Sequence, residues 1–375
     1  MEKEQIIAAA RHLARVINVL NIGGEIPPLP DGITYRDVFI IAKRHSLAGA
    51  LCYAIEDIVK DSDPELTTRL RKERDLECAK NITQTREFSA VTSAFTEGGV
   101  RFLPMKGFIF KDLWARPEYR TMSDMDIYVG REEIDRATEI LCGMGYTLDH
   151  GDDVHNSLFK QIYVNIELHK LLEVGVEGDF SRWTPKPDNE YWYVMSDEDL
   201  LAFVISHMYK HHVTGGNGMR SVYDVYLFLG AKRDTLDLER VREVLKERDI
   251  LDFFDKTLAL ADFWFASGEG SEELFELEYY TVTGGTYGTV ENKVELAMKK
   301  KSKLSYLLSR IFLPYSSMKK LYKWLVPLPF LLPFAWIARI FKALFDGRLR
   351  RELMAVDAAE RRASEKEADT IPPKE

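Results

Sequence analysis

Three acidic residues of this chain have types and spacing that suit catalytic chemistry. Asp124 and Asp126 stand two apart at the start of an apolar run, so on a β-strand their side chains share one face. Neighbouring carboxylates repel each other unless a cation lies between them, and hard divalent cations prefer oxygen ligands. An Asp-x-Asp pair on a strand therefore indicates a Mg²⁺ site. A site with two ions needs a third acid, and Glu167 in a nearby strand-like run is the best candidate.

A Lys-Gly pair lies upstream of these acids, between an apolar run and a short helical stretch. At such a turn, a glycine without Cβ and the amide groups that begin a helix let the backbone approach a phosphate. Lys106 adds positive charge beside Gly107, and Arg116 and Arg120 in the following loop are placed to neutralise more. If the two strands are adjacent, this turn faces the pair of Asp124 and Asp126 across the strand ends.

The spacing of apolar residues predicts the elements that must position these side chains. A helical period changes near residue 100 to the alternating period of strands and returns after Ser196, a predicted helix N-cap. This order predicts an α+β fold in which helical regions flank a small mixed sheet. Five regions follow: helical 1–97, the α/β core 98–195, helical 196–298, a basic aromatic-rich helical segment 299–356 and a frayed tail 357–375.

Individual elements are predicted inside these regions. A long helix runs from about Pro64 to Thr96, because proline suits a first helical turn and two glycines follow. Alternation predicts strands, and a helical period predicts helices. The strands are expected at 100–106, at 125–129 and twice within 157–171; the helices at 107–114, 132–146, 196–212, 222–229 and 236–257; and a hairpin or ordered loop near 281–293.

Composition limits the class of protein and its compartment. The net charge of −9 argues against a dedicated nucleic-acid binder, so nucleic acid is an unlikely partner. Cys52, Cys78 and Cys142 are widely spaced and form no CxxC pair, which favours reduced thiols in the cytoplasm. The first residues form a charged amphipathic helix without the features of a signal peptide.

The segment after residue 298 is strongly basic, with thirteen Lys or Arg and one acid between residues 299 and 351. Residues 326–345 approach membrane-spanning length, but three prolines break the first half and Arg339 and Lys342 interrupt the second. A spanning helix is not expected. Three interpretations stay open: a helix docked on the main body, an interfacial anchor on anionic lipid, and a basic surface for a polyanionic acceptor.

Several other polar residues have simpler interpretations. His207 and His211 lie one helical turn apart but lack an obvious third ligand, so they are predicted to be core or surface histidines. Arg220 and Asp224 are most simply an intrahelical ion pair, although they would also suit a substrate pocket. His169 is expected to pack or hydrogen-bond near the acidic site.

In their order along the chain, these motifs resemble the nucleotidyltransferase superfamily with a polymerase-β-like fold. The closer resemblance is to the bacterial family of uncharacterised nucleotidyltransferases. The likeness extends over most of residues 35–345 and rests on Lys106-Gly107, Arg120-x-x-Ser123-Asp124-x-Asp126 and Glu167-Leu168-His169. Two positions depart from the family pattern: Phe108 follows Gly107 where serine is usual, and Glu167 stands where aspartate is commoner.

The resemblance implies transfer of a nucleoside monophosphate from an NTP to a hydroxyl, with pyrophosphate leaving. It implies that Asp124, Asp126 and Glu167 are catalytic and hold Mg²⁺ or Mn²⁺. The residues implied to bind the nucleotide are Lys106, Gly107, Arg120 and Ser123. The acceptor stays open between a small molecule, a sugar and a protein, and the oligomeric state is undefined.

Two other functions stay open. One is a non-catalytic nucleotide-binding or scaffold protein with a degenerate site. The other is a peripheral membrane protein of glycan assembly, with membrane contact through 299–351. Arg120 also has a structural alternative, an ion pair with Asp124.

Overall fold

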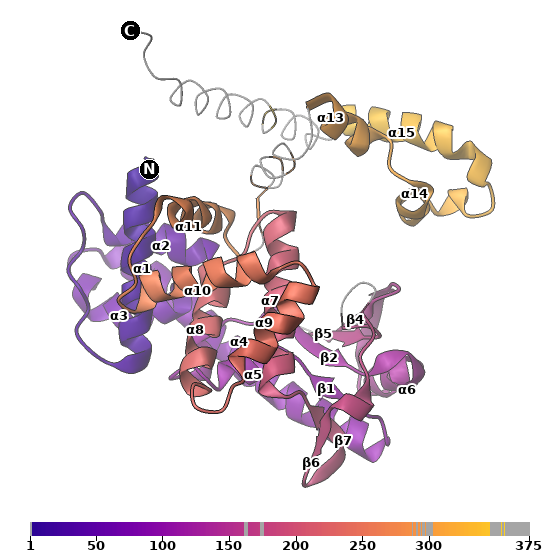
Figure 1. Cartoon of the computed structure of the whole chain (residues 1–375), viewed down its shortest axis with the longest axis horizontal. Helices are drawn as coiled ribbons and strands as arrows, with labels where there is room; N and C mark the ends of the chain where they lie inside the picture. The colour runs from indigo at the N-terminus through magenta and orange to yellow at the C-terminus, as the bar shows by residue number, and fades with distance from the viewer. Residues whose placement is uncertain are drawn as a thin grey trace. The chain divides into compact units, whose positions relative to one another are not determined.

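The computed structural model describes residues 2–160, 164–172, 176–286 and 303–345, with single positions at 288, 289, 292, 294, 297, 354 and 356. The chain forms two compact units. The first comprises Met1–Lys210 and Gly218–Thr286, and the second comprises His211–Asn217 and Tyr287–Glu375. Figure 1 shows both units with their elements labelled. The tail predicted at 357–375 lies outside the described residues.

Four helices build the N-terminal part of the first unit, where a helical region was predicted. They are α1 (Lys3–Ile22), α2 (Tyr35–Arg44), α3 (Ala48–Val59) and α4 (Pro64–Glu97). Thr34 caps α2 in a capping box with Asp37, and Asp63 caps α4, whose first residue is a proline. The predicted long helix from Pro64 is confirmed. Its buried residues Val91 and Phe95 contribute to the core beneath the sheet.

A five-stranded mixed sheet forms the α/β core. Its strands are β1 (Leu103–Pro104), β2 (Met125–Tyr128), β3 (Thr147–Gly151), β4 (His155–Phe159) and β5 (Asn165–His169). Their order in the sheet is β1-β2-β5-β4-β3. Only β2 and β5 run parallel; the other neighbouring pairs are antiparallel. The predicted α+β fold with a mixed sheet is confirmed.

One face of β2 and β5 is apolar and fixes the strand register. Met125, Ile127, Ile166 and Leu168 are fully buried in a core shared with α4 and with α6 (Gly130–Gly143). Each such side chain contributes roughly 1.5–3 kcal/mol of burial energy. Because a one-residue slip would turn all four toward the opposite face, the register is strongly specified. The residues that alternate with them, including Asp126, must therefore lie on the other face.

The strand predictions were wrong in two respects. The strand expected at 100–106 shrinks to two residues, and the backbone of Phe102, just before them, pairs with Tyr191 and Tyr193. The sequence analysis also missed β3 and the hairpin of β6 (Thr184–Lys186) and β7 (Asn189–Val194). All five residues of β3 are exposed, so no apolar alternation marked it. The run of aromatic residues in β7 was a usable signal.

Helices return from Asp197, where the Ser196 hydroxyl accepts a hydrogen bond from the Asp199 amide as predicted. The helical stretch expected at 236–257 is two helices, because Asp249 adopts a positive φ of 57° that ends the first. The hairpin or loop expected near 281–293 is wrong for its first four residues, which continue a helix; part of the remainder lies outside the described residues. These helices are α7 (Asp197–Thr214), α8 (Met219–Ala231), α9 (Leu238–Glu247), α10 (Leu251–Phe265) and α11 (Glu272–Gly284).

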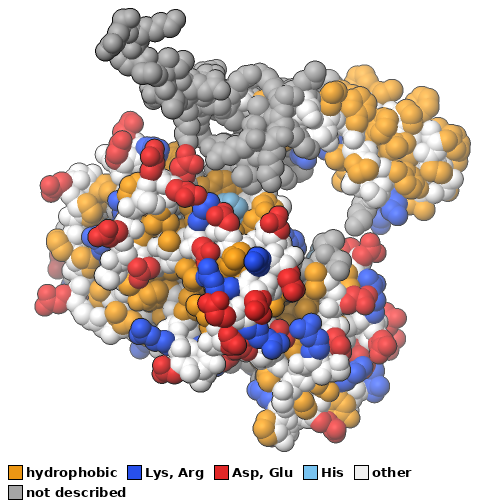
Figure 2. All heavy atoms as spheres, viewed as in Figure 1, with side chains coloured by type: hydrophobic (Ala, Val, Ile, Leu, Met, Phe, Trp, Pro, Cys, Tyr) orange, Lys and Arg blue, Asp and Glu red, His pale blue; other side chains and the backbone are white. Residues whose placement is uncertain are grey.

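The second unit carries the basic aromatic-rich segment. Its helices are α13 (Lys303–Ile311), α14 (Tyr315–Leu321) and α15 (Leu332–Phe345), with short 3₁₀ turns at Lys323–Leu325 and Pro329–Leu331. Within the part of the chain that the structure describes, every helix is too short or too polar to cross a membrane. Figure 2 shows many hydrophobic side chains at the surface of this segment.

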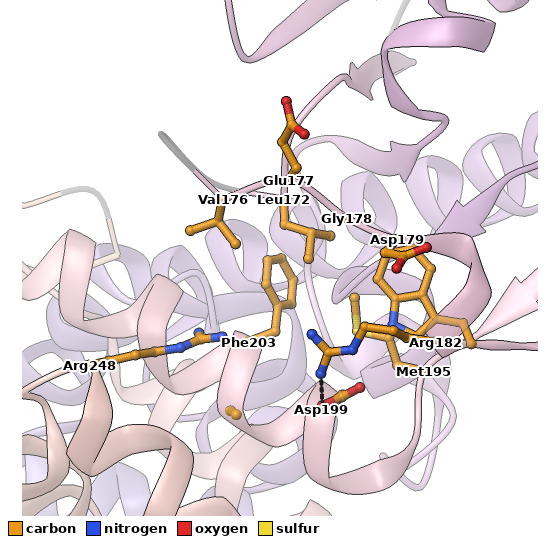
Figure 3. A pocket seen from close by; sticks show the side chains of 12 residues that line it. Leu172, Val176, Glu177, Gly178, Asp179, Arg182, Met195, Asp199, Phe203 and Arg248 are labelled. Carbon is orange, nitrogen blue, oxygen red and sulfur yellow. Dashed lines mark ion pairs between the residues drawn. The ribbon is translucent and has the colours of Figure 1, made fainter.

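Two pockets open in the first unit around residues 176–183. The pocket in Figure 3 has a volume of about 60 Å³, room for a few water molecules, and Phe203 lines it beside an ion pair of 3.5 Å between Arg182 and Asp199. The second has a volume of about 380 Å³, within the range of small-molecule pockets, and is lined by Tyr128 and Phe180 among others.

Candidate active site

Asp126 and Glu167 lie side by side on the polar face of the sheet. In the parallel pairing of β2 and β5 these two residues are direct partners, although 41 positions separate them in the chain. The carbonyl of Asp126 also accepts a hydrogen bond of 3.0 Å from the Met105 amide, which ties β2 to the Lys-Gly turn. Two carboxylates from different parts of the sequence are thus fixed together on rigid strands.

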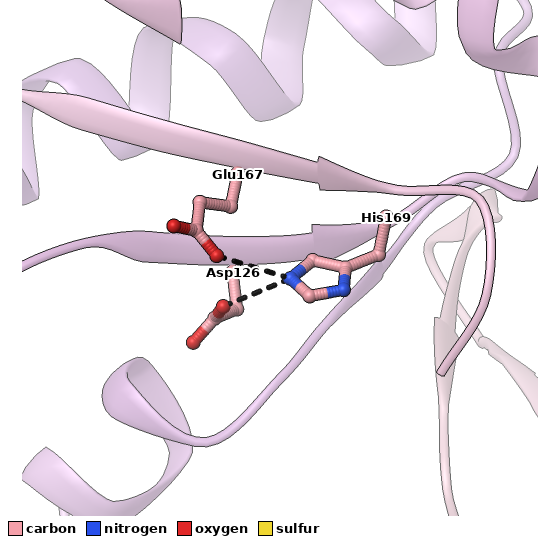
Figure 4. Close-up of side chains that lie close together, drawn as sticks. All are labelled: Asp126, Glu167 and His169. Atoms are coloured by element: carbon pink, nitrogen blue, oxygen red, sulfur yellow. Dashed lines mark hydrogen bonds and ion pairs between the residues drawn. The ribbon is translucent and has the colours of Figure 1, made fainter. Parts of the chain in front are cut away.

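His169 joins the two carboxylates. It stands two residues after Glu167 on β5, so both side chains share the polar face. Its Nε2 lies 3.0 Å from Asp126 Oδ1 and 3.6 Å from Glu167 Oε2 (Figure 4). Because an ionised carboxylate only accepts hydrogen bonds, Nε2 is the donor to Asp126. The predicted role of His169, hydrogen bonding near the site, matches this geometry.

Lys106 approaches Asp126 from the other side. Its Nζ lies 3.5 Å from Asp126 Oδ2 and 5.6 Å from the centre of the Phe203 ring. Phe203 also lines the pocket of Figure 3. Neither pocket is lined by Asp126 or Glu167. For the location of chemistry, the convergence of charged side chains is the stronger evidence.

The charges of the site are strongly coupled. Burial alone would raise the pKa of Asp126, but Lys106 and the hydrogen bond from His169 outweigh burial and hold that pKa far below the usual value. His169 also lowers the pKa of Glu167 against the effect of burial. In turn, the two carboxylates raise the pKa of His169, although its burial acts in the opposite direction. Asp126 and Glu167 therefore stay ionised.

Asp124 lies near this pair but outside the tightest group. It is half-buried, and burial together with the charges of Asp126 and Glu167 raises its pKa to about 6. Among the described residues, the ligand atoms that converge within 4.8 Å of one another belong to Asp126, Glu167 and His169. The sequence analysis expected Asp124, Asp126 and Glu167 to converge; the structure places His169 in the group and Asp124 beside it.

The donor set fits a divalent cation. Carboxylate oxygens suit Mg²⁺ and Mn²⁺, and an imidazole nitrogen close by is compatible with Mn²⁺. After burial, the charges of Asp126 and Glu167 are the causes that raise the pKa of Asp124. A cation among these side chains would relieve that repulsion.

The Lys-Gly turn is held in an unusual backbone conformation. Lys106 has a φ of 41°, which is rare for a residue with a side chain and tends to occur at functional sites. Gly107, the first residue of α5 (Gly107–Lys111), is required by a close approach: a Cβ there would lie 2.2 Å from the sulfur of Met122. The turn is therefore locked against the loop that leads into β2. Ser123, in this loop, is half-buried.

Arg120 forms a buried ion pair with a residue of α8. Its guanidinium donates to both oxygens of Asp224 at 2.9 and 2.8 Å and to the carbonyl of Gly107 at 3.3 Å. Trp114 donates to the same carboxylate at 2.9 Å. The structural alternative for Arg120 is thus right in kind, but the partner is Asp224 rather than Asp124.

Two predictions about α8 need correction as a result. The ion pair expected between Arg220 and Asp224 is replaced by the pair with Arg120, because the loop of residues 112–124 packs onto this helix. Arg220 instead donates to the carbonyl of Thr121 in the same loop. Both residues therefore hold the loop that precedes the catalytic strand.

The sequence analysis missed two residues near the site. His155 on β4 lies 3.9 Å from Glu167 through its Nε2, and only the pairing of β4 with β5 could have revealed this. Lys111 is buried on α5 with its Nζ 2.7 Å from Asn81 of α4, and burial lowers its pKa to about 8. The apolar run around Lys111 was the available signal for its burial.

A mixed sheet with adjacent carboxylates on its polar face and a Lys-Gly turn opposite them has the features of a nucleotidyltransferase. A family model described as uncharacterised nucleotidyltransferase matches residues 31–266, well over half of the chain, and the chain belongs to this family. The resemblance predicted from the motifs is confirmed.

Comparison with other proteins adds a distant structural likeness. The chain is similar to the solution structure of the antibiotic-resistance factor ANT(2″)-Ia, with 11% sequence identity and a TM-score of 0.37. That match covers 47% of this chain and 96% of the other. No curated protein matches the chain.

Proposed function

We propose that this protein transfers a nucleoside monophosphate from an NTP to a hydroxyl group of an acceptor, with pyrophosphate as the leaving group. The observation that carries the proposal is the direct pairing of Asp126 with Glu167 on parallel strands, with Lys106 3.5 Å from Asp126. Membership of a nucleotidyltransferase family supports the reaction class.

Asp124, Asp126 and Glu167 would hold Mg²⁺ or Mn²⁺ in this proposal. The chemistry that such an ion supplies is charge neutralisation on the triphosphate and a lower pKa for the acceptor hydroxyl. Glu167 is the group assigned to take the hydroxyl proton, since its carboxylate is ionised and partly accessible. His169 orients both carboxylates through its Nε2 and is a positioning residue.

The Lys-Gly turn would bind the phosphates. Lys106 supplies positive charge next to Asp126, the Gly107 amide begins α5, and the Ser123 hydroxyl precedes Asp124. The guanidinium nitrogens of Arg120 all donate to Asp224 or Gly107. We therefore assign Arg120 the task of fixing this turn and not the predicted contact with phosphate.

The acceptor is proposed to be a small molecule, a sugar-related compound or a protein side chain. The proposed compartment is the cytoplasm, because Cys52, Cys78 and Cys142 are free thiols. A net charge of −9 disfavours nucleic acid as the acceptor.

The test is incubation of the purified chain with each labelled NTP and Mg²⁺ or Mn²⁺, followed by measurement of pyrophosphate release and of label on protein. Asp126→Asn should abolish both signals. Asp149→Asn is the matched control, because this aspartate lies on β3 of the same sheet and is 62% exposed, and it should keep full activity. Equal pyrophosphate release from wild type and Asp126→Asn would contradict the proposal.

A second candidate function is a nucleotide-binding scaffold without catalysis. Two features favour it: Phe108 stands where the family has serine and stacks on Phe88, with ring centres 3.7 Å apart, and Glu167 replaces the commoner aspartate. Binding of NTP that needs Lys106 but yields no pyrophosphate with any acceptor extract would favour this function. Turnover that depends on Asp126 would exclude it.

A further inference from the structure

The second unit exposes large hydrophobic side chains in an unusually dense group. Within residues 324–341, the exposed fractions are 72% for Phe330, 64% for Phe334, 59% for Phe341 and 50% for Ile337. Figure 2 shows hydrophobic side chains gathered at the surface of the segment that carries α13, α14 and α15. Contiguous apolar surface of this kind marks an interaction site in a folded protein.

Three members of the exposed group share one face of α15, and Phe330 lies on the 3₁₀ turn just before this helix. Phe334, Ile337 and Phe341 stand at i, i+3 and i+7, so they share a face of the helix. The opposite face is already used: Ala335 is fully buried and the Trp336 indole donates to the carbonyl of Leu313 at 2.9 Å. An apolar helix face is stable against an apolar environment. Among the described residues of this unit, none covers the face of Phe334, Ile337 and Phe341.

The charge around this face selects the kind of partner. Between residues 299 and 351 there are thirteen Lys or Arg and one acid, in a chain whose net charge is −9. Lys319 and Lys323 are exposed beside Trp324, itself 43% exposed. Exposed aromatic and aliphatic side chains flanked by lysines and a tryptophan are typical of segments that lie in the interface of an anionic bilayer.

Two other occupants fit these observations less well. A second copy of the same face would bring two strongly basic segments together, and like charges repel. A complementary apolar patch on the first unit is also missing among its described residues, because its exposed hydrophobics are scattered over separate elements, such as Ile22 on α1, Ile82 on α4 and Phe275 on α11.

We infer that residues 324–341 dock on the surface of an anionic membrane, with Phe330, Phe334, Ile337 and Phe341 entering the interface and the flanking lysines contacting lipid phosphates. Since no described helix is long and apolar enough to span a bilayer, the contact is peripheral. The inference does not depend on nucleotidyl transfer. It selects one of the three interpretations that the sequence left open for this segment.

The experiment is flotation of the full-length protein with phosphatidylcholine vesicles that contain or lack phosphatidylglycerol. Wild type should float with anionic vesicles, and the bound fraction should fall at high salt because the lysine contacts are screened. The double variant Phe330→Ser/Phe334→Ser should lower vesicle affinity by about tenfold or more, since two large apolar side chains no longer enter the interface. Lys319→Gln/Lys323→Gln should weaken binding to anionic vesicles alone.

Ile82→Ser is the matched control, because this side chain is 69% exposed on α4 of the first unit and its loss should leave flotation unchanged. Circular dichroism and thermal unfolding verify that each variant is folded. Absence of wild-type flotation with anionic vesicles would overturn the inference. A loss of dimer in ultracentrifugation on Phe330→Ser/Phe334→Ser, without any vesicle binding by wild type, would identify a second copy as the occupant and overturn it as well.

Discussion

Two regions of this protein hold side chains in surroundings that oppose their usual preference. On the polar face of β2 and β5, the carboxylate of Asp126 is buried and that of Glu167 is half-buried, whereas on α15 the rings of Phe334 and Phe341 are exposed to water. Charged groups normally lie outside and large apolar groups inside, so both arrangements cost free energy.

The two regions differ in where the compensation comes from. Lys106 and His169 offset the buried carboxylates within the first unit, at distances of 3.5 and 3.0 Å from Asp126. For the exposed face of α15, the described residues of its own unit offer no such partner. An internally compensated site suits catalysis because it is preorganised, while an uncompensated surface indicates a partner outside the protein.

The largest effect is expected from removing the charged partner of a buried carboxylate in the first unit, the carboxylate of Asp224. Arg120→Met would leave Asp224 buried without its cation and remove a contact with Gly107. We expect a loss of about 3–5 kcal/mol in the free energy of unfolding, measured by urea denaturation. Arg116→Met is the control, since this arginine of the same loop is 54% exposed and should cost less than about 1 kcal/mol. Equal losses for both variants would contradict the role given to Arg120.

A second prediction concerns His45, a buried histidine whose hydrogen bond from the Met219 amide requires a neutral ring. Its Nε2 donates to the Val282 carbonyl and its Nδ1 accepts from the Met219 amide, each at 3.1 Å. Burial lowers the pKa of His45 to about 4 from an unfolded value of 6.5. As the pH falls, His45 is protonated first in the unfolded chain. The contribution of the neutral His45 to the free energy of unfolding is therefore complete above pH 6.5 and is lost toward pH 4.

Between pH 6.5 and pH 4, the free energy of unfolding should fall by about 3 kcal/mol because of His45. Denaturation of wild type and His45→Phe at a series of pH values would measure it. In His45→Phe, the free energy of unfolding should no longer fall by this amount as the pH is lowered. In His150→Phe, a change at a histidine that is 57% exposed, the fall should remain. Identical slopes in wild type and His45→Phe would show that His45 does not titrate on unfolding.

A third and smaller effect is expected from removing Lys106, the cation that balances the negative charge of Asp126. Lys106→Met removes the cation 3.5 Å from Asp126 and, in the proposed function, a phosphate contact. Nucleotidyl transfer should fall by about 10- to 100-fold, mostly through weaker NTP binding measured by titration calorimetry. Lys43→Met, at a lysine that pairs with Glu73 and is 49% exposed, is the control and should bind NTP normally. Unchanged NTP affinity in Lys106→Met would remove the lysine from the site.

The smallest effect concerns Phe330, an exposed side chain on the 3₁₀ turn that precedes α15. Phe330→Ser should change the free energy of unfolding by less than about 0.5 kcal/mol, because a side chain that is 72% exposed buries little on folding. Urea denaturation without lipid measures this value. A loss of more than about 2 kcal/mol would mean that Phe330 is buried in the folded protein, and the contrast between the two regions would fail.

Much of the local structure followed from the sequence. Proline at the start of α4 and the Ser196 cap are satisfied within a few residues, so local patterns specified them. The strand β3 and the separation of α9 from α10 were not foreseen, because an exposed strand shows no alternation and a positive φ at Asp249 has no apolar signature.

The kinds of residue in the candidate site could be predicted, but not which residues contact one another there. Asp126 and Glu167 were expected to act together, and the parallel pairing of their strands brings them side by side. The partners of Arg120 and Asp224 could not be predicted, since each has a nearer opposite charge in the sequence. His155 lies near Glu167 only because β4 pairs with β5.

The sequence by itself determined the class of this protein, because the ordered motifs and the apolar periodicities are properties of neighbouring residues and need no long-range contact to be recognised. Tertiary structure alone decided which charges neutralise one another: His169 bridges two carboxylates, Lys106 faces Asp126, and Arg120 turns to α8. The physical reason is that Coulomb energies and hydrogen bonds depend on distance in space, and only the packing of strands and helices sets those distances.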